Sequence, residues 1–262
     1  PAFSGRYFDE VTVRDILAWQ EALGASGLSF SYRAGLRGFL ASIYKYAARY
    51  CEAVNIIDRV EPPRNTDPPR EMHFWTREQF RTFIEKVDDP TYALLFRTLY
   101  ITGCRKGEAF ALTWEDFDPS AGTLTINKSV TRKTDSGAYA VTTPKNASSV
   151  RTVDLPTSLT SALLSYRSEI PDGARFIFGC DRPLPEQTVT RAFDKAIAAA
   201  GVPRIRIHDL RHSCASLLIS EGISIVAVSH RLGHKNIEQT LNTYSHMMPR
   251  DNDKMLAALE GI

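Results

Sequence analysis

The residues that are able to carry out chemistry on a phosphate group gather near the C-terminal end of the chain. They are His208, Arg211, His212, His234 and Tyr244. The planar guanidinium of arginine binds phosphate oxygens in pairs, and a tyrosine hydroxyl becomes a nucleophile once it is positioned and deprotonated. A histidine is able to accept or donate the proton in such a step. Arg211 and the histidines beside it are therefore suited to hold an anion, whereas Tyr244 taken alone has the spacing of a core residue.

The first of these residues require a helix that starts at His208. Its buried face is expected to consist of Leu210, Cys214, Leu217 and Leu218. The polar residues of the first turn then lie on the opposite side, where the unpaired N–H groups of a helix start also attract an anion. A polar helix start that only faces water gives the same pattern.

A metal site is the alternative for the two histidines of this turn. His208 and His212 are spaced like the zinc ligands of the HExxH proteases, but Asp209 stands where such enzymes have a catalytic glutamate. His234 and His246 lie downstream, and nothing in their spacing makes either of them a third ligand. We therefore expect no metal and no other cofactor.

Two motifs upstream complete a pattern with this stretch. The sequence reads TGCRKGE at residues 102–108, KNASSVR at residues 145–151, HDLRH at residues 208–212 and LGH at residues 232–234, with Tyr244 ten residues after the last histidine. In this order the motifs resemble those of the tyrosine recombinases, the phage-integrase family. Four ordered motifs are far more specific than any one of them.

The resemblance implies a nucleophile, two phosphate contacts and a general acid. Tyr244 would attack the scissile phosphate, although its helical spacing from apolar neighbours is also that of a core residue. Arg105 and Arg211 would hold the non-bridging oxygens and stabilise the charge of the transition state. Lys145 would protonate the leaving 5′ oxygen, a task that needs a lysine with a lowered pKa.

Three further residues would support these groups. The resemblance implies that His208 assists proton transfer with the tyrosine, that His234 donates a hydrogen bond to the phosphate, and that Glu108 orients Arg105. Without the resemblance, Glu108, Arg105 and Lys145 are each explained equally well as solvated surface residues.

The function that the resemblance implies is site-specific DNA recombination, as in the integrases of phages and conjugative transposons. One strand would be cut to give a 3′-phosphotyrosine, and a 5′ hydroxyl from a partner duplex would resolve it, so that a mobile element is integrated or excised. The implied partners are double-stranded DNA with specific core sites, a homo-tetramer on that DNA and an accessory directionality factor. A type-IB-like topoisomerase and a non-catalytic DNA-binding regulator are the alternatives.

The chain of 262 residues is long enough for two domains. Prolines, which disfavour helix, are concentrated in EPPRNTDPPR, so we expect a linker at residues 61–74. It would separate a helical core-type DNA-binding domain at residues 1–60 from a catalytic domain at residues 75–250. Because the first residue is Pro1 and not methionine, the first domain is expected to be truncated. No apolar run is long enough for a membrane span, and the protein is expected in the cytoplasm, at the nucleoid when it acts.

Hydrophobic spacing predicts a mostly α fold with a small antiparallel sheet. Helices are expected at residues 11–23, 30–54, 157–168 and 186–200 and after a capping box at Thr76 and Gln79, and strands at residues 123–126 and 150–155 with one or two between them. The resemblance further implies that the two domains form a C-shaped clamp around the duplex.

Two basic patches are the expected DNA contacts, although each also suits a solvated surface. In the helix at residues 30–54 the aromatic side chains are expected to pack inward while the cations face phosphates. The candidates are Arg33, Arg37, Lys45 and Arg49 in this helix, and Arg132, Lys133 and Arg151 near the strands.

The last residues, 251–262, are expected to form a short helix with Met255, Leu256, Leu259 and Ile262 on one face. A helix of this length is not stable alone, so that face must dock on another surface. It docks either on its own domain or, by the family precedent, on a neighbouring protomer in a ring of four.

Overall fold

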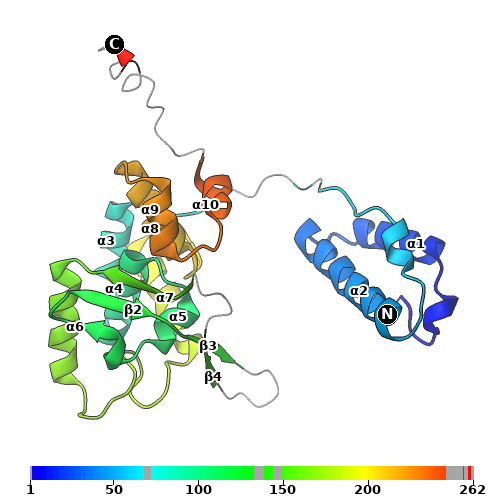
Figure 1. Ribbon diagram of the computed structural model, residues 1–262. Helices are drawn as coiled ribbons and strands as arrows, with labels where there is room; N and C mark the ends of the chain where they lie inside the picture. Colours follow the sequence, from blue (N-terminus) through cyan, green and yellow to red (C-terminus); the bar gives the residue numbers. More distant parts are fainter. Residues whose placement is uncertain are drawn as a thin grey trace. The chain divides into compact units, whose positions relative to one another are not determined.

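The computed structural model describes residues 2–65, 67, 72–132, 139–143, 149–245, 256 and 259–260. The chain divides between Glu71 and Met72 into two units, a boundary that falls within the linker predicted at residues 61–74. Each unit has its own hydrophobic core, so each is described by itself (Figure 1). Among the described residues, no helix is long and apolar enough to cross a membrane.

The first unit is helical. Its elements are η1 (Phe8–Glu10), α1 (Val13–Ala25), α2 (Phe30–Tyr50) and η2 (Ile56–Arg59). Thr12 is the N-cap of helix α1: its hydroxyl accepts from the Asp15 N–H, while the Asp15 carboxylate accepts from the Thr12 N–H. Helix α2 ends earlier than predicted. Ile16, Tyr44 and Ile57 are among the buried side chains that join these elements.

The second unit is mostly helical with small antiparallel sheets, as predicted. Its helical elements are α3 (Arg77–Ile84), α4 (Pro90–Thr102), α5 (Lys106–Ala111), η3 (Trp114–Asp116), α6 (Thr157–Glu169), α7 (Glu186–Ala200), α8 (Asp209–Ser220), α9 (Ile225–Leu232) and α10 (Ile237–Tyr244). Its strands are β1 (Phe117–Asp118), β2 (Thr123–Ile126), β3 (Ser129–Arg132), β4 (Tyr139–Thr142) and β5 (Arg151–Asp154). Strands β1, β2 and β5 form one sheet in that order, and β3 pairs with β4 in another. Strand β5 begins at Arg151, which pairs with Ile126, the last residue of β2.

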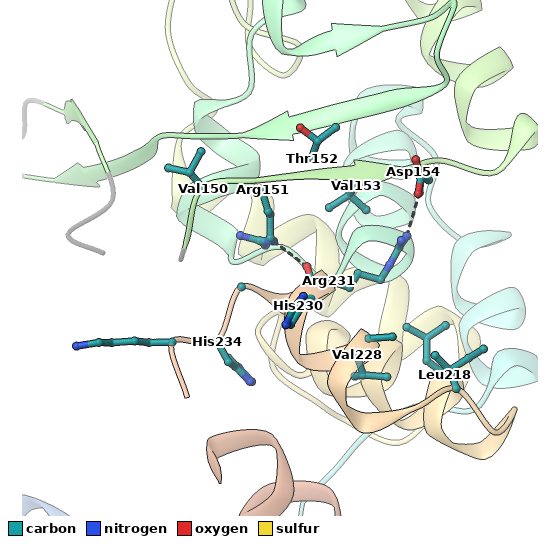
Figure 2. Close-up of a pocket in the computed structure, with 14 residues that line it drawn as sticks. Val150, Arg151, Thr152, Val153, Asp154, Leu218, Val228, His230, Arg231 and His234 are labelled. Atoms are coloured by element: carbon teal, nitrogen blue, oxygen red, sulfur yellow. Dashed lines mark hydrogen bonds between the residues drawn. The ribbon is translucent and has the colours of Figure 1, made fainter. Parts of the chain in front are cut away.

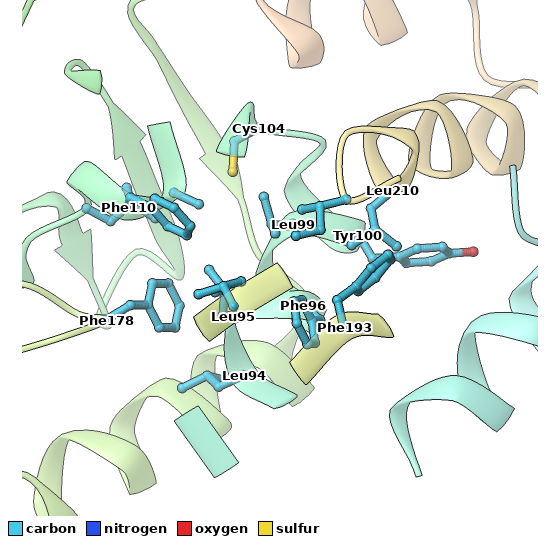
Figure 3. Packing of buried hydrophobic residues seen from close by; sticks show 14 of the residues in the cluster. Leu94, Leu95, Phe96, Leu99, Tyr100, Cys104, Phe110, Phe178, Phe193 and Leu210 are labelled. Carbon is cyan, nitrogen blue, oxygen red and sulfur yellow. The ribbon is translucent and has the colours of Figure 1, made fainter. Parts of the chain in front are cut away.

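Helix α4 runs through the core of the second unit. Asp89 caps its N-terminus and Pro90 occupies its first turn, where no N–H donor is needed. The helix packs against α6 and α8, and its Leu95 and Phe96 lie in an aromatic core that includes Phe193 (Figure 3). Because most of its sides face other elements, the helix is apolar nearly all round. This packing also fixes the position of its C-terminal end.

The predicted inward packing of the aromatic residues of α2 is wrong. Tyr32, Phe39, Tyr46 and Tyr50 are each more than half exposed, whereas Tyr44 is buried. The core of the first unit is small and covers one face of α2, so side chains on the other faces point to solvent whatever their polarity.

The side chain of Arg37 on α2 forms hydrogen bonds within the first unit. Its Nε donates to the Gln20 side chain at 2.9 Å, and its Nη2 donates to the backbone carbonyls of Ile57 and Val60. The half-buried guanidinium therefore ties α2 to α1 and to η2. These hydrogen bonds give Arg37 a role in the fold of the unit, and its predicted contact with DNA phosphates stays a prediction.

The other predicted cations of α2 differ in their availability. Arg33 is mostly buried and pairs with Asp67 at 3.3 Å. Lys45 and Arg49 are exposed, so these two are the most available of the four predicted phosphate contacts of this helix.

Arg37→Ala should lower the free energy of unfolding of the first unit by about 1–3 kcal/mol, because three acceptors lose a charged donor. Denaturant unfolding of the chain measures the difference. Lys45→Ala, which removes an exposed cation from the same helix, should change the stability by less than about 0.5 kcal/mol. Equal stabilities of the two variants would show that the Arg37 contacts do not support the fold.

Candidate active site

The TGCR motif ends α4 in a turn that only glycine fits. Gly103 has a φ of +64°, and a Cβ there would lie 2.6 Å from the Leu232 side chain and 3.3 Å from Cys214 Sγ. The left-handed backbone and the close approach of α8 and α9 both exclude a side chain. The turn brings Arg105 to the start of α5.

A buried carboxylate connects two arginines. Glu108, which is 4% exposed, accepts from the backbone N–H and the Nη1 of Arg105 at 2.8 Å, and from the Nη2 of Arg151 at 2.9 Å. Burial alone raises the pKa of this carboxyl, but the hydrogen bonds and charges of the two arginines outweigh burial and lower the pKa. Glu108 is therefore an ionised, buried partner of Arg105 and not a surface carboxylate.

The side chain of Arg151 is only 7% exposed, and its predicted role as a DNA contact stays a prediction. Its Nε donates to the Arg231 carbonyl at 2.7 Å and its Nη1 to the Ser149 carbonyl at 3.0 Å. A Cβ at Gly233 would lie 2.8 Å from Nη1, so the glycine of the LGH motif makes room for this guanidinium. Arg151 thus joins β5 to the end of α9.

The guanidinium of Arg211 is buried against the TGCR turn. Its Nη1 donates to the Gly103 carbonyl at 2.7 Å, whereas its Nη2 is shielded from solvent and has no hydrogen-bond partner among the described residues. Burial, and then the nearby Arg105 and Arg151, lower the pKa of Arg211 to about 10, so it is still charged at neutral pH. A helix start that only faces water is therefore excluded at this residue. A buried cation with an unused donor is suited to an anion.

Three rings lie in a row from the start of α8 to α10. The ring centroids of His208 and His212 are 5.3 Å apart and those of His212 and Tyr244 are 5.9 Å apart. The Nδ1 atom of His212 lies 2.7 Å from the Tyr244 hydroxyl. Burial lowers the pKa of both histidines. Neutral imidazoles at this place are able to accept the proton of the phenol.

Tyr244 is also a core residue. Its side chain is 1% exposed and packs in the apolar cluster formed by α8 and α9. Burial raises the pKa of its hydroxyl, although the charge of Arg211 acts in the opposite direction. The interpretation of Tyr244 as a core residue is confirmed, and its role as nucleophile stays a prediction.

His234 is held in place by α10. Its Nδ1 lies 2.7 Å from the hydroxyl of Thr240, which is completely buried. Burial, and then the charges of Arg211 and Arg105, lower the pKa of His234 to about 4. The ring is therefore neutral at pH 7, and its second nitrogen has no hydrogen-bond partner among the described residues.

An open groove of about 770 Å³ borders this cluster, between β5 and α9 (Figure 2). Arg151 and His234 are among its lining residues. Arg231 spans from α9 to the carbonyls of Asp154 on β5, at 3.2 Å, and of Ile101 on α4, at 2.9 Å. Hydrogen bonds between elements that are distant in sequence thus hold the walls of the groove together.

Several predicted residues lie outside the described part of the chain. These are Lys145, Lys133, His246 and most of residues 251–262, together with the side chain of Arg132. Among the residues that are described, no three His, Cys, Asp or Glu side chains gather closely enough to hold a metal ion.

The sequence predictions missed Thr240 as part of the site, and they did not identify His212 as the histidine that contacts the tyrosine. The two histidines of HDLRH lie in one helical turn, so the motif alone does not indicate which of them contacts the tyrosine. Thr240 precedes Tyr244 by one turn, and this spacing places both on one face of α10. That spacing is the signal that would have pointed to Thr240.

Comparisons with known proteins agree with this arrangement. The model of the phage integrase family matches residues 74–250. The ICEBs1 integrase of Bacillus subtilis (strain 168) is 30% identical over 271 residues, which cover 97% of this chain and 72% of that protein. A putative prophage phiRv2 integrase of Mycobacterium tuberculosis (strain ATCC 25618 / H37Rv) is 30% identical over 190 residues, which cover 70% of this chain and 49% of that protein.

Solved structures share the fold. The Tn1549 transposon integrase in complex with transposon right end DNA has a TM-score of 0.76 and 22% identity, covering 98% of this chain and 87% of that one. A lambda integrase dimer bound to a COC′ core site has a TM-score of 0.64 and 18% identity, covering 94% of this chain and 82% of that one.

Glu108→Gln should destabilise the second unit by about 3–5 kcal/mol at pH 7, because buried guanidinium charge loses its carboxylate. Since the folded-state pKa of Glu108 is lowered, the carboxylate stabilises the fold fully above the ordinary value of 4.5 and progressively less as the pH falls through the folded-state value. The difference in stability between wild type and variant, measured by denaturant unfolding, should therefore shrink in acid. Glu115→Gln, at an exposed carboxylate of the same unit, is the matched control. Wild-type stability of the Glu108 variant at pH 7 would contradict the buried-pair account.

Proposed function

The chain belongs to the phage integrase family and is a tyrosine recombinase, and from this premise we propose that it integrates and excises a mobile element by cutting and rejoining DNA strands at specific core sites. The proposal rests mainly on Arg211. Its guanidinium is buried, and one of its nitrogens has no hydrogen-bond partner among the described residues. It lies near helix α10, whose Tyr244 hydroxyl contacts His212. A DNA phosphate is the anion that would use the Arg211 donor.

The first step of the proposed reaction is attack by Tyr244 on the scissile phosphorus. A bond forms between the phenolic oxygen and phosphorus while the bond to the 5′ oxygen breaks, leaving a 3′-phosphotyrosine. Arg105 and Arg211 stabilise the charge that develops on the non-bridging oxygens. The 5′ oxygen leaves with a proton that we assign to Lys145.

The proton of the phenol is assigned to His212, since its Nδ1 already contacts the Tyr244 hydroxyl. His208 then assists the transfer indirectly, because its ring packs edge-on against that of His212 and limits its movement. His234 donates to a phosphate oxygen. In the second step a 5′ hydroxyl attacks the phosphotyrosine, the same proton transfers run in reverse, and no external energy source is needed.

The burial of Tyr244 adds a condition to this reaction. With 1% of the residue exposed, the phenol reaches a bound phosphate only if the phosphate enters the space beside His212 while α10 stays docked. We propose that DNA binding brings the phosphate there, so that the free protein keeps its nucleophile covered.

The partners belong to the same proposal. Lys45 and Arg49, the exposed cations of α2, would contact phosphates of the duplex and position it. Four protomers on two duplexes, with an accessory factor for directionality, would carry out strand exchange. The exposed Leu256 and Leu259 suit the docking of residues 251–262 on a neighbouring protomer.

Tyr244→Phe should bind DNA with nearly unchanged affinity and form no covalent adduct with a nicked suicide substrate made from candidate element ends, because only the nucleophilic oxygen is lost. Denaturing gels with labelled DNA measure the adduct, in the presence of excess EDTA. Tyr100→Phe removes the hydroxyl of another buried tyrosine, one that has no hydrogen-bond partner, and should form the adduct at the wild-type rate.

Adduct formation by Tyr244→Phe at that rate would overturn the proposal. Relaxation of supercoiled DNA by the wild type without defined sites would replace it with a topoisomerase. A wild type that binds DNA and yields no adduct with any substrate would replace it with a DNA-binding regulator.

A further inference from the structure

Helix α10 contacts the site through two hydroxyl groups that lie one turn apart. Tyr244 meets His212, and Thr240 meets His234, in both cases at 2.7 Å from Nδ1. The first contact concerns the nucleophile. The contact between Thr240 and His234 has no role in the reaction proposed above. Thr240 is nevertheless completely buried, and its partner His234 is the histidine proposed to donate to the phosphate.

The direction of the Thr240 hydrogen bond follows from the surroundings of its hydroxyl. Within the part of the chain that the structure describes, His234 Nδ1 is its single hydrogen-bond partner. If Nδ1 carried the proton and donated it, the buried hydroxyl proton of Thr240 would have no acceptor, which is costly. Thr240 therefore donates to Nδ1, and the ring proton of a neutral His234 is on Nε2.

We propose that Thr240 is a positioning residue that keeps the proton of His234 on Nε2, so that His234 donates to the phosphate only while α10 is docked. This inference rests on the proposed function. With the other tautomer, Nε2 presents a lone pair to the phosphate oxygens and repels them. Withdrawal of α10 would thus remove the nucleophile and one phosphate donor together, and a protomer would be fully competent or inactive.

The tautomer is observable without any reaction. The chain has six histidines, so two-bond ¹H–¹⁵N correlation spectra of histidine-labelled protein are sparse, and the spectrum of His234→Asn assigns the His234 signals. We expect a protonated Nε2 and a bare Nδ1 in the wild type and in Thr240→Ser. In Thr240→Val, which keeps the shape and loses the hydroxyl, the proton should redistribute between the two nitrogens.

Adduct formation with saturating nicked substrate is the second measurement. Thr240→Val should slow it by roughly 10–100-fold, the usual cost of losing the hydrogen-bond partner of a functional histidine, and Thr240→Ser should restore most of the rate. Thr243→Val is the matched control, because the Thr243 hydroxyl on the same helix donates only to the Gln239 carbonyl. It should change neither the spectrum nor the rate.

A wild-type spectrum with the proton on Nδ1, or a Thr240→Val variant with unchanged tautomer and rate, would overturn the inference. If Thr240→Val does not fold, the wild-type spectrum and the Thr240→Ser rate still decide it. A wild type that yields no adduct would refute the proposed function, and the tautomer would still report on Thr240.

Discussion

The site depends on several arginine side chains that lie close together with few carboxylates to balance their charge. Arg105, Arg151 and Arg211 lie close enough to affect one another, and Glu108 is the carboxylate that pairs with two of them. Burial, and then repulsion from Arg105 and Arg151, lowers the pKa of Arg211. A phosphate that enters the cluster relieves this repulsion. The protein has therefore spent folding stability on a site whose charges become favourable only when an anion is bound.

The elements around the cluster are arranged to make that crowding possible. Gly103 and Gly233 lack the Cβ atoms that would displace Leu232 and the Arg151 guanidinium, respectively. Arg231 links α9 to strand β5 and to α4. The same packing that brings the cations together also buries Tyr244. The fold therefore positions the nucleophile without exposing it.

Regular elements and their caps were predictable, whereas the partners of individual side chains were not. Thr12 and Gly103 act through neighbours in sequence, and local chemistry alone places a helix start or end at each. The burial of Arg37 and Arg151 depends on carbonyls 20 to 80 residues away, which no local pattern encodes. The burial of the aromatic residues of α2 was mispredicted for the same reason. Periodicity indicates which residues share a face of a helix, but it does not indicate which faces other elements will cover.

The central claim is that the free N–H of Arg211 stabilises charge that develops during cleavage. Arg211→Lys tests it directly, because lysine keeps the charge and loses the planar fork. Binding affinity and the rate of adduct formation at saturating DNA should be measured side by side. The account predicts a rate that falls by about 100-fold or more with affinity changed only a few-fold. A variant that binds more weakly and cleaves at the wild-type rate once saturated would contradict it.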